Sequence, residues 1–196
     1  MARQASDVGA EPDDAVPARA GGAAAAATPC EERGDADLMA WVEARGVVAR
    51  LVVPGVPTPT VPAAAAALGV GVDAILKSLV FLVRGEPRLV IAAGEDRVRY
   101  PALAALWGVS RRRVRLATPS EALALSGYAV GAMPPFGHLR SLPTVVDTRA
   151  VLPARIVYAG GGSRAALLEI RTDELLRVTA ATLSDLTHHP DGGDRQ

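Results

Sequence analysis

The sequence predicts an α/β or α+β domain built on a mixed, partly antiparallel sheet. Segments with strand composition alternate with segments that carry helix start and stop signals, which is typical of these fold classes. Two pairs of strands, 75–83 with 88–93 and 155–159 with 165–170, are separated by turns short enough for β-hairpins. The 196-residue chain is 49% hydrophobic and only 4% aromatic, so it can bury a core made mainly of Val, Leu, Ile and Ala.

The expected elements follow from short-range signals along the chain. Asp35 or Asp37 is a candidate cap for the first helix, and Thr60 for the second, which has a proline in its first turn. Residues 118–121, Thr-Pro-Ser-Glu, predict a capping box with proline at the first helical position, and residues 172–174 are candidate caps for the last helix. In chain order we expect a helix at 35–45, a strand at 47–53, a helix at 62–68, a turn at 73–76, a strand through 83, a strand at 88–93, helices at 100–107 and 118–126, strands at 142–146, 155–159 and 165–170, a helix at 172–178 and an extended segment at 183–186.

The two ends of the chain differ from its middle. Residues 1–34 are rich in Ala, Gly, Pro, Asp and Glu and contain almost no large apolar residues. Such a segment cannot bury enough surface to offset the entropy lost on ordering. We therefore expect a disordered tail at 1–34, a single domain at 35–187 and a flexible tail at 188–196. The adjacent His188 and His189 are weak evidence for a metal site, because no cysteine or acidic cluster stands near them.

Bulk composition argues against several classes of function. The 21 basic and 21 acidic residues give no net charge, which disfavours a strongly steered binder of long nucleic acid but not a protein that touches one RNA end. The single cysteine, Cys30, rules out an internal disulfide framework and fits a reducing compartment. No apolar run approaches the ~20 residues needed to cross a membrane, and the N-terminus lacks a signal-peptide layout. We expect a cytoplasmic protein without a membrane partner.

One basic residue lies inside an apolar strand. Lys77 falls within residues 75–83, and it is the only lysine of the chain, all other basic residues being arginine. Lysine can lay its stem on a core and keep its ammonium in water, whereas a buried lysine is rare unless it is paired. Both a structural lysine and a ligand-holding lysine are open at this point. The neighbouring Ser78 is expected to hydrogen-bond only with its neighbours in the strand.

Two further stretches are candidates for binding. Arg111, Arg112, Arg113 and Arg115 form a basic run that is either a solvated loop or a phosphate contact. Residues 127–138 hold three glycines and two prolines in twelve residues, which predicts a loop of fixed shape. Exposed peptide N–H groups in such a loop can stabilise a carbonyl oxygen as it becomes an oxyanion. Alone the signal is weak, because Pro/Gly loops are common.

Together these stretches resemble a known family. Residues 72–81, 127–138 and 142–147, followed by the glycine turn at 160–162 and a strand, are similar in order and spacing to the YbaK/ProX (YbaK/EbsC-like) aminoacyl-tRNA deacylases. These proteins belong to the prolyl-tRNA-editing superfamily. The resemblance covers roughly residues 58–186 and leaves the N-terminal segment outside.

The resemblance implies a fold, an activity and a site. The implied fold is a mixed, mostly antiparallel, barrel-like sheet flanked by helices. The implied activity is hydrolysis of the ester that joins a wrong amino acid to the terminal adenosine of tRNA, with no metal or other cofactor. The family's lysine falls on Lys77 and its Gly-x-x-x-Pro loop on Gly131–Pro135. The implied partners are the acceptor 3′ end of tRNA and, as a candidate, an aminoacyl-tRNA synthetase.

The resemblance also assigns roles to residues. Lys77 and Gly131 are the catalytic candidates, with Lys77 holding the substrate carbonyl or terminal phosphate while the ribose hydroxyl helps to activate water. An ester is already activated, so water, oxyanion stabilisation and positioning matter more than a strong base. His138 is either a general base or a loop residue that stacks on adenine or caps the backbone, and Asp147 is expected to orient a turn. The substrate-binding candidates are Tyr128, Ala132, Met133, Pro134, Pro135, Phe136, Gly137, His138, Gly161 and Gly162, and the RNA-contact candidates are Arg111, Arg112 and Arg113.

Two functions are consistent with these residues. The first is a stand-alone trans-editing deacylase acting on a small mischarged amino acid, and the second is a non-catalytic module that binds a tRNA 3′ end or an aminoacyl ligand beside a synthetase. The presence of both Lys77 and the Gly131–Pro135 loop favours the enzyme, because a degenerate binder would be expected to lose one of them. The apolar run 165–168 differs from the branches that remove cysteine from tRNA(Pro).

Overall fold

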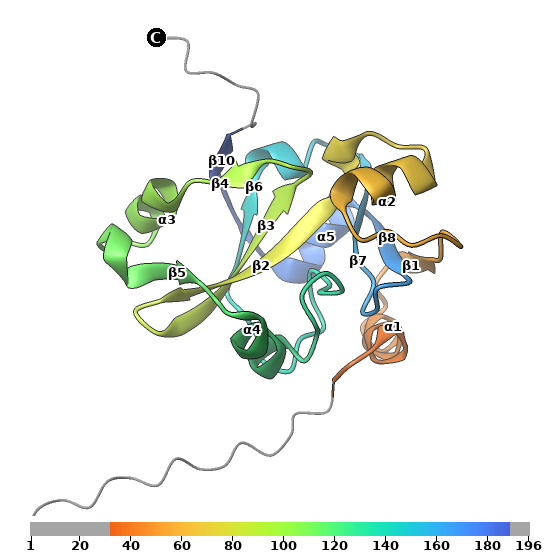
Figure 1. Cartoon of the computed structure of the whole chain (residues 1–196), viewed down its shortest axis with the longest axis horizontal. Helices are drawn as coiled ribbons and strands as arrows, with labels where there is room; N and C mark the ends of the chain where they lie inside the picture. The colour runs from red at the N-terminus through yellow and green to blue at the C-terminus, as the bar shows by residue number, and fades with distance from the viewer. Residues whose placement is uncertain (1–31, 189–196) are drawn as a thin grey trace, which may run out of the picture.

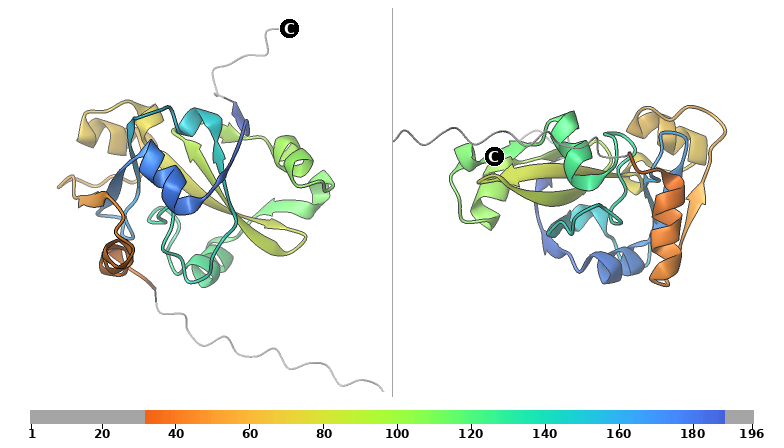
Figure 2. Two further views of the ribbon diagram at one scale, coloured as in Figure 1. Left: turned by 180° about the vertical axis from the view of Figure 1, so that it is seen from behind. Right: turned by 90° about the horizontal axis from the view of Figure 1, so that it is seen from below.

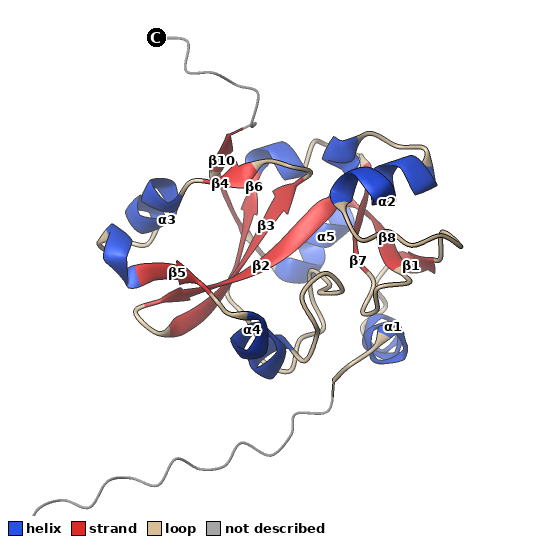
Figure 3. Ribbon diagram, viewed as in Figure 1, coloured by secondary structure: helices blue, strands red, loops and turns tan. Residues whose placement is uncertain are grey.

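The computed structural model describes residues 32–188, and the predictions for residues 1–31 and 189–196, including Cys30 and His189, lie outside them. Helices flank three sheets in this part of the chain (Figures 1 and 3). Its helices are α1 (Asp35–Ala44), α2 (Val61–Leu68), α3 (Tyr100–Leu106), α4 (Pro119–Ser126) and α5 (Thr172–Thr179), with 3₁₀ turns at Val72–Ala74, Arg111–Arg113 and Thr148–Ala150. Its strands are β1 (Ala49–Val52), β2 (Leu76–Val83), β3 (Glu86–Ala93), β4 (Arg97–Val98), β5 (Val114–Leu116), β6 (Thr144–Asp147), β7 (Ile156–Gly160), β8 (Leu167–Arg171), β9 (Thr182–Ser184) and β10 (Thr187–His188).

The sheet topology confirms a mixed, mostly antiparallel α/β fold. The largest sheet has the order β5-β2-β3-β6-β9, and smaller sheets have the orders β1-β8-β7 and β10-β4. The β2–β3 pair is an antiparallel hairpin in register from Leu76–Ala93 to Val83–Glu86, and β7–β8 is a second antiparallel pair. Among the strand ladders of residues 32–188, only β3–β6 and β6–β9 run parallel. Both predicted hairpins are therefore present.

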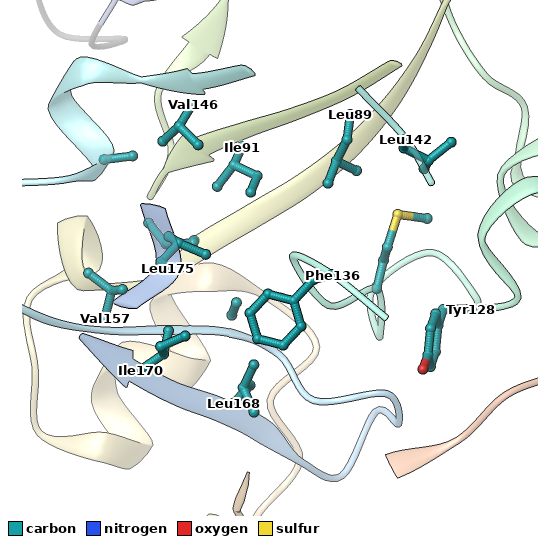
Figure 4. Packing of buried hydrophobic residues seen from close by; sticks show 14 of the residues in the cluster. Leu89, Ile91, Tyr128, Phe136, Leu142, Val146, Val157, Leu168, Ile170 and Leu175 are labelled. Carbon is teal, nitrogen blue, oxygen red and sulfur yellow. The ribbon is translucent and has the colours of Figure 1, made fainter. Parts of the chain in front are cut away.

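The barrel-like closure implied by the resemblance needs correction. β2 and β7 meet only at an isolated bridge between Ile75 and Tyr158, and no ladder within the described residues joins the outer edges of the two sheets. The interior between the sheets is filled by side chains from outside them, including Phe136 from the loop before β6 and Leu175 from α5 (Figure 4). The sheets therefore enclose a core without forming a closed barrel.

Helix-capping signals were good predictors where a hydroxyl precedes the helix. The Thr60 hydroxyl accepts from the Ala63 N–H at 3.3 Å, and Thr118 and Glu121 form the expected reciprocal box. The first cap was wrong: Gly34 is the N-cap of α1, and Asp37 accepts from the Gly34 N–H at 2.9 Å.

The cap predicted for the last helix was also wrong. Thr172 is the first residue of α5 because β8 leads directly into the helix, and the Thr172 hydroxyl donates to the Leu152 carbonyl at 2.8 Å. The residue at the N-cap position, Arg171, makes no side-chain capping bond. No loop is left between strand and helix in which a hydroxyl could cap the helix end.

Three short strands have little local signal. Part of the basic run expected as a loop forms β5, because Val114 is buried and pairs antiparallel with Val83 of β2. His188, expected to begin the tail, pairs with Arg97 through β10 and β4. The tail boundary expected at 34 also moves, since Arg33 donates to the Gly137 carbonyl at 2.8 Å. Each of these elements depends on a distant partner rather than on its own residues.

The strand that carries Lys77 is buried on both faces. Val80 and Leu82 pack into the core between the sheets, whereas Phe81 packs into a second cluster with Leu103 of α3.

α5 lies behind the large sheet in Figure 1 and in front of it in the reverse view (Figure 2). The longest helix of residues 32–188 has ten residues, so none of these helices is a candidate membrane span.

Candidate active site around Lys77

Lys77 and Gly131 line the same cleft, as expected. The cleft has a volume of about 240 Å³ and lies where the first half of β2 faces the start of α2 and the loop at 130–133. Its walls are mainly small or apolar. They are formed by Thr58, Pro59, Thr60, Val61, Ala64, Ile75, Leu76, Ser78, Leu79, Val130, Met133, Gly160 and Leu167.

The Lys77 ammonium is anchored rather than free. Lys77 is half-buried, and Nζ donates a hydrogen bond to the main-chain carbonyl of Asp96 in the turn after β3. Burial lowers the pKa of Lys77 from its ordinary value, while the negative charges of Asp96 and Glu95 act in the opposite direction. A snorkelling lysine would place its ammonium in water. The observed contact instead directs the charge to one side of the cleft.

Ser78 contributes an unused hydroxyl to the cleft. Its Oγ is buried and has no hydrogen-bond partner among the described residues, so the expectation of a bond within its strand surroundings was wrong. Leaving a buried hydroxyl unsatisfied costs about 1–3 kcal/mol. The pattern Lys-Ser in an apolar strand was the available signal, but a lone serine is too common to single out.

The loop beside Lys77 is held by the glycine turn after β7. The Gly162 N–H donates to the Ala132 carbonyl at 2.9 Å, and a Cβ at Gly160 would lie 2.3 Å from the Met133 carbonyl oxygen. Gly161 donates instead to the Ala166 carbonyl at 3.1 Å. Of the two glycines expected to bind substrate, Gly162 therefore braces the loop and Gly161 closes its own turn, and Gly160 is the glycine that lines the cleft.

The rest of the loop faces a different hollow. Residues 135–138 line a hollow of about 430 Å³. The other walls are Trp41 of α1, Arg45 at the C-cap of α1, Arg140 and the end of α5. Phe136 stacks on Trp41 with ring centroids 5.1 Å apart, and the Arg45 guanidinium lies 4.3 Å from the centroid of the Trp41 ring. This hollow is larger than the cleft but lacks Lys77. The predicted substrate-binding loop is thus divided between two surfaces.

Three other loop candidates line neither hollow. Tyr128 is fully buried, and Ala132 and Pro134 are also buried. Tyr128, a substrate-binding candidate, is a core residue (Figure 4). Asp147 orients a turn as predicted, since its buried carboxylate accepts from the Arg149 N–H at 2.9 Å and the Leu186 N–H at 2.7 Å.

His138 is poorly placed to act as a base on a substrate at Lys77. It lines the larger hollow, and Nε2 lies 3.0 Å from the Pro134 carbonyl oxygen, to which it donates as the protonated ring nitrogen. Burial is the main cause that lowers the pKa of His138 to about 4. The imidazole is therefore neutral at pH 7, and it serves as a backbone cap, one of the two alternatives expected for it.

This burial predicts a pH-dependent stability. The pKa of His138 is about 4 in the folded chain and 6.5 as its ordinary value, so below pH 6.5 the unfolded chain binds a proton that the folded chain does not. We expect the contribution of His138 to lower the free energy of unfolding by up to about 3 kcal/mol as the pH falls from 6.5 to 4. Urea unfolding of wild type and His138→Gln across this range measures it. Equal pH dependence in the two proteins would contradict the prediction.

The basic run is partly used within the chain. Arg111 lies over the Tyr100 ring at 3.9 Å, and Arg115 forms a two-bond ion pair with Glu121 at 2.7 Å. Arg112 and Arg113 are exposed and form no ion pair with any residue of 32–188. Two of the three predicted RNA contacts are therefore available to an external anion. The described part of the chain holds no cluster of three His, Cys, Asp or Glu side chains suited to a metal ion.

A lysine on an inner strand of a mixed sheet, facing a glycine–proline loop across a small cleft, defines the class of protein as an editing-type α/β domain. Residues 56–178, more than half of the chain, match the aminoacyl-tRNA editing domain family. The chain belongs to this family, and the resemblance drawn from its three sequence blocks is confirmed.

Relatives include proteins of known structure. The chain is 37% identical to the hypothetical protein APE2540, with a TM-score of 0.71 and coverage of 78% of this chain and 99% of the other. It is 32% identical to a proposed trans-editing enzyme for prolyl-tRNA synthetase, with a TM-score of 0.71 and coverage of 83% and 99%. It is also 31% identical to the uncharacterized protein YwhH of Bacillus subtilis (strain 168), covering 59% of this chain and 72% of YwhH.

Proposed function

We propose that the protein is an aminoacyl-tRNA deacylase that acts in trans on mischarged tRNA. The observation that carries the proposal is the cleft that Lys77, Ser78 and Gly131 line together. Membership of the editing-domain family and the likeness to a proposed trans-editing enzyme support the same activity. The proposed setting is the cytoplasm, with tRNA as substrate and a synthetase as a candidate partner.

The proposed chemistry is water attack on the aminoacyl ester. Water adds to the carbonyl carbon, and the bond from this carbon to the ribose oxygen breaks. The free hydroxyl of the terminal ribose relays a proton: it accepts one from the attacking water and gives its own to the departing ribose oxygen, which leaves as a hydroxyl. Lys77 holds the carbonyl or the terminal phosphate by charge, and exposed N–H groups near Gly131 stabilise the developing oxyanion. These roles need no strong protein base, which fits the neutral, remote His138.

The size and lining of the cleft favour a small aminoacyl group. A volume of about 240 Å³, lined by Val61, Ala64 and Leu167, must hold the terminal ribose and the ester as well as the side chain, which leaves little room for a large side chain. Selection by size in an apolar pocket is modest, about 10- to 200-fold per methylene. Such a pocket therefore suits an enzyme that removes errors after the synthetase has made them.

Deacylation of a panel of labelled aminoacyl-tRNAs tests the proposal. We expect hydrolysis of at least one small aminoacyl ester well above the buffer rate and little hydrolysis of aromatic ones. If no ester is hydrolysed while aminoacyl-tRNA still binds, the alternative applies, a binding module for the tRNA 3′ end. If hydrolysis is equal for small and large side chains, the proposal that this cleft selects by size is wrong.

RNA contact by the basic run is proposed for Arg112 and Arg113. Replacing both with glutamine is expected to weaken tRNA binding and to reduce the slope of log Kd against log salt by about 1.5, because two phosphate contacts are lost. The matched control is the double change Arg50→Gln and Arg177→Gln, since these arginines are paired with Glu169 and Glu174. An unchanged salt slope in the Arg112 and Arg113 variant would rule out this contact.

A further inference from the structure

The ammonium of Lys77 is bound by a turn that is itself tied down. Lys77 pairs with Ala92 in the β2–β3 ladder, and the chain then turns through Gly94, whose N–H donates to the Ile75 carbonyl at 2.6 Å. Two residues further on, the Asp96 carbonyl accepts from Lys77 Nζ. The position of the ammonium therefore depends on the position of one peptide group in the turn between β3 and β4.

The side chain of the same residue anchors this turn. Asp96 is only 6% exposed, and a buried carboxylate is stable only when it is paired. Its Oδ2 accepts from the Thr187 hydroxyl and lies 3.3 Å from Arg149 Nε. Thr187 comes from β10, which pairs with β4 immediately after Asp96. Segments from three distant parts of the chain thus converge on one carboxylate.

We propose that Asp96 is a positioning residue for Lys77: its buried carboxylate, held by Thr187 and Arg149, fixes the carbonyl that directs the Lys77 ammonium. The proposal rests on the proposed role of Lys77 in deacylation. A free lysine side chain loses rotamer entropy when it is immobilised. A prearranged acceptor removes part of that cost before substrate binds. β10, which lies beyond the matched residues 56–178, would then serve the site from a distance.

The charges around the ammonium act together with this geometry. Asp96 and Glu95 favour the charged form of Lys77, and Arg97 of β4 opposes it. Arg149, in the turn after β6, offsets part of the Asp96 charge through the ion pair. Asp73 lines a further hollow together with Asp96 and Arg149. A change at Asp96 therefore alters both position and charge, whereas a change at the exposed Glu95 alters charge alone.

The single lysine allows a direct measurement. Full-length protein grown with ¹³Cε-lysine and carrying a lysine-free tag gives one side-chain signal, which reports the pKa and mobility of Lys77. The test compares Asp96→Asn and Thr187→Val with the control Glu95→Gln, and melting curves confirm folding. For Asp96→Asn we expect the pKa of Lys77 to fall, because a charge that favours the ammonium is lost, the signal to report a more mobile side chain, and kcat/KM for deacylation to drop about tenfold. Thr187→Val is expected to mobilise Lys77 with little change in its pKa.

The outcomes separate this proposal from the proposed function. A folded Asp96→Asn protein whose Lys77 side chain is as immobile as in wild type would overturn the positioning role, and so would an equal gain of Lys77 mobility in Glu95→Gln. If Asp96→Asn does not fold, Thr187→Val decides, because valine keeps the shape of threonine and removes only the hydroxyl. If wild type hydrolyses no aminoacyl-tRNA, the deacylase fails, while the signal of Lys77 still tests whether Asp96 positions it.

Discussion

Replacing Lys77 with methionine is expected to reduce kcat/KM for deacylation by about 10²- to 10³-fold, the loss typical of removing one group that stabilises an oxyanion. Methionine keeps an unbranched stem against the cleft but removes the charge. The protein should remain folded, because methionine carries no charge. Its burial therefore lacks the desolvation cost that lowers the pKa of Lys77. Single-turnover hydrolysis with enzyme in excess measures the chemical step separately from product release.

Two further variants serve as controls for this prediction. Lys77→Arg keeps the charge but places it on a planar fork, and we expect it to recover only part of the activity. Arg84→Gln removes a positive charge from the exposed turn at the far end of the same hairpin and should act as wild type. Wild-type rates in Lys77→Met would show that the lysine is structural, although family membership would stand.

Gly160→Ala is expected to disrupt the loop beside Lys77. A Cβ at this position would lie 2.3 Å from the Met133 carbonyl oxygen and 2.7 Å from that of Ala132. Both contacts are with backbone, so the loop at 131–133 must move. We expect a loss of about 1–3 kcal/mol in the free energy of unfolding and about 10²-fold in kcat, because displacing a catalytic loop by about 1 Å has effects of that size. Chemical unfolding and single-turnover deacylation provide the two measurements.

The same substitution elsewhere provides the control. A Cβ at Gly34, the N-cap of α1, would meet nothing within 4 Å, and its φ is −119°. Gly34→Ala should therefore cost only the N-cap preference of glycine over alanine, about 1 kcal/mol or less, and leave deacylation unchanged. If Gly160→Ala is as stable and active as Gly34→Ala, the close approach of the loop to β7 does not matter for the site.

The site was predictable where composition was unusual. Lys77 is conspicuous because it is the only lysine and lies in an apolar strand, and residues 127–138 are conspicuous for glycine and proline. Both signals led to one cleft. The sequence could not show that Phe136 and His138 face a second hollow, because that division depends on how α1 and α5 pack against the loop. It also could not show that Ser78 lacks a partner, since its surroundings come from other segments.

What the sequence determined by itself is local: the β2–β3 hairpin, the caps at Thr60 and Thr118, and the two stretches that meet at the cleft. Alternation, capping and turn chemistry act over a few residues, so they can be read in order along the chain. The tertiary structure alone decided the open sheets, the strands β4, β5 and β10, and the anchoring of Lys77 by Asp96. Those features join distant segments, 91 residues apart in the bond from Thr187 to Asp96. Their stability comes from partners that no local pattern specifies.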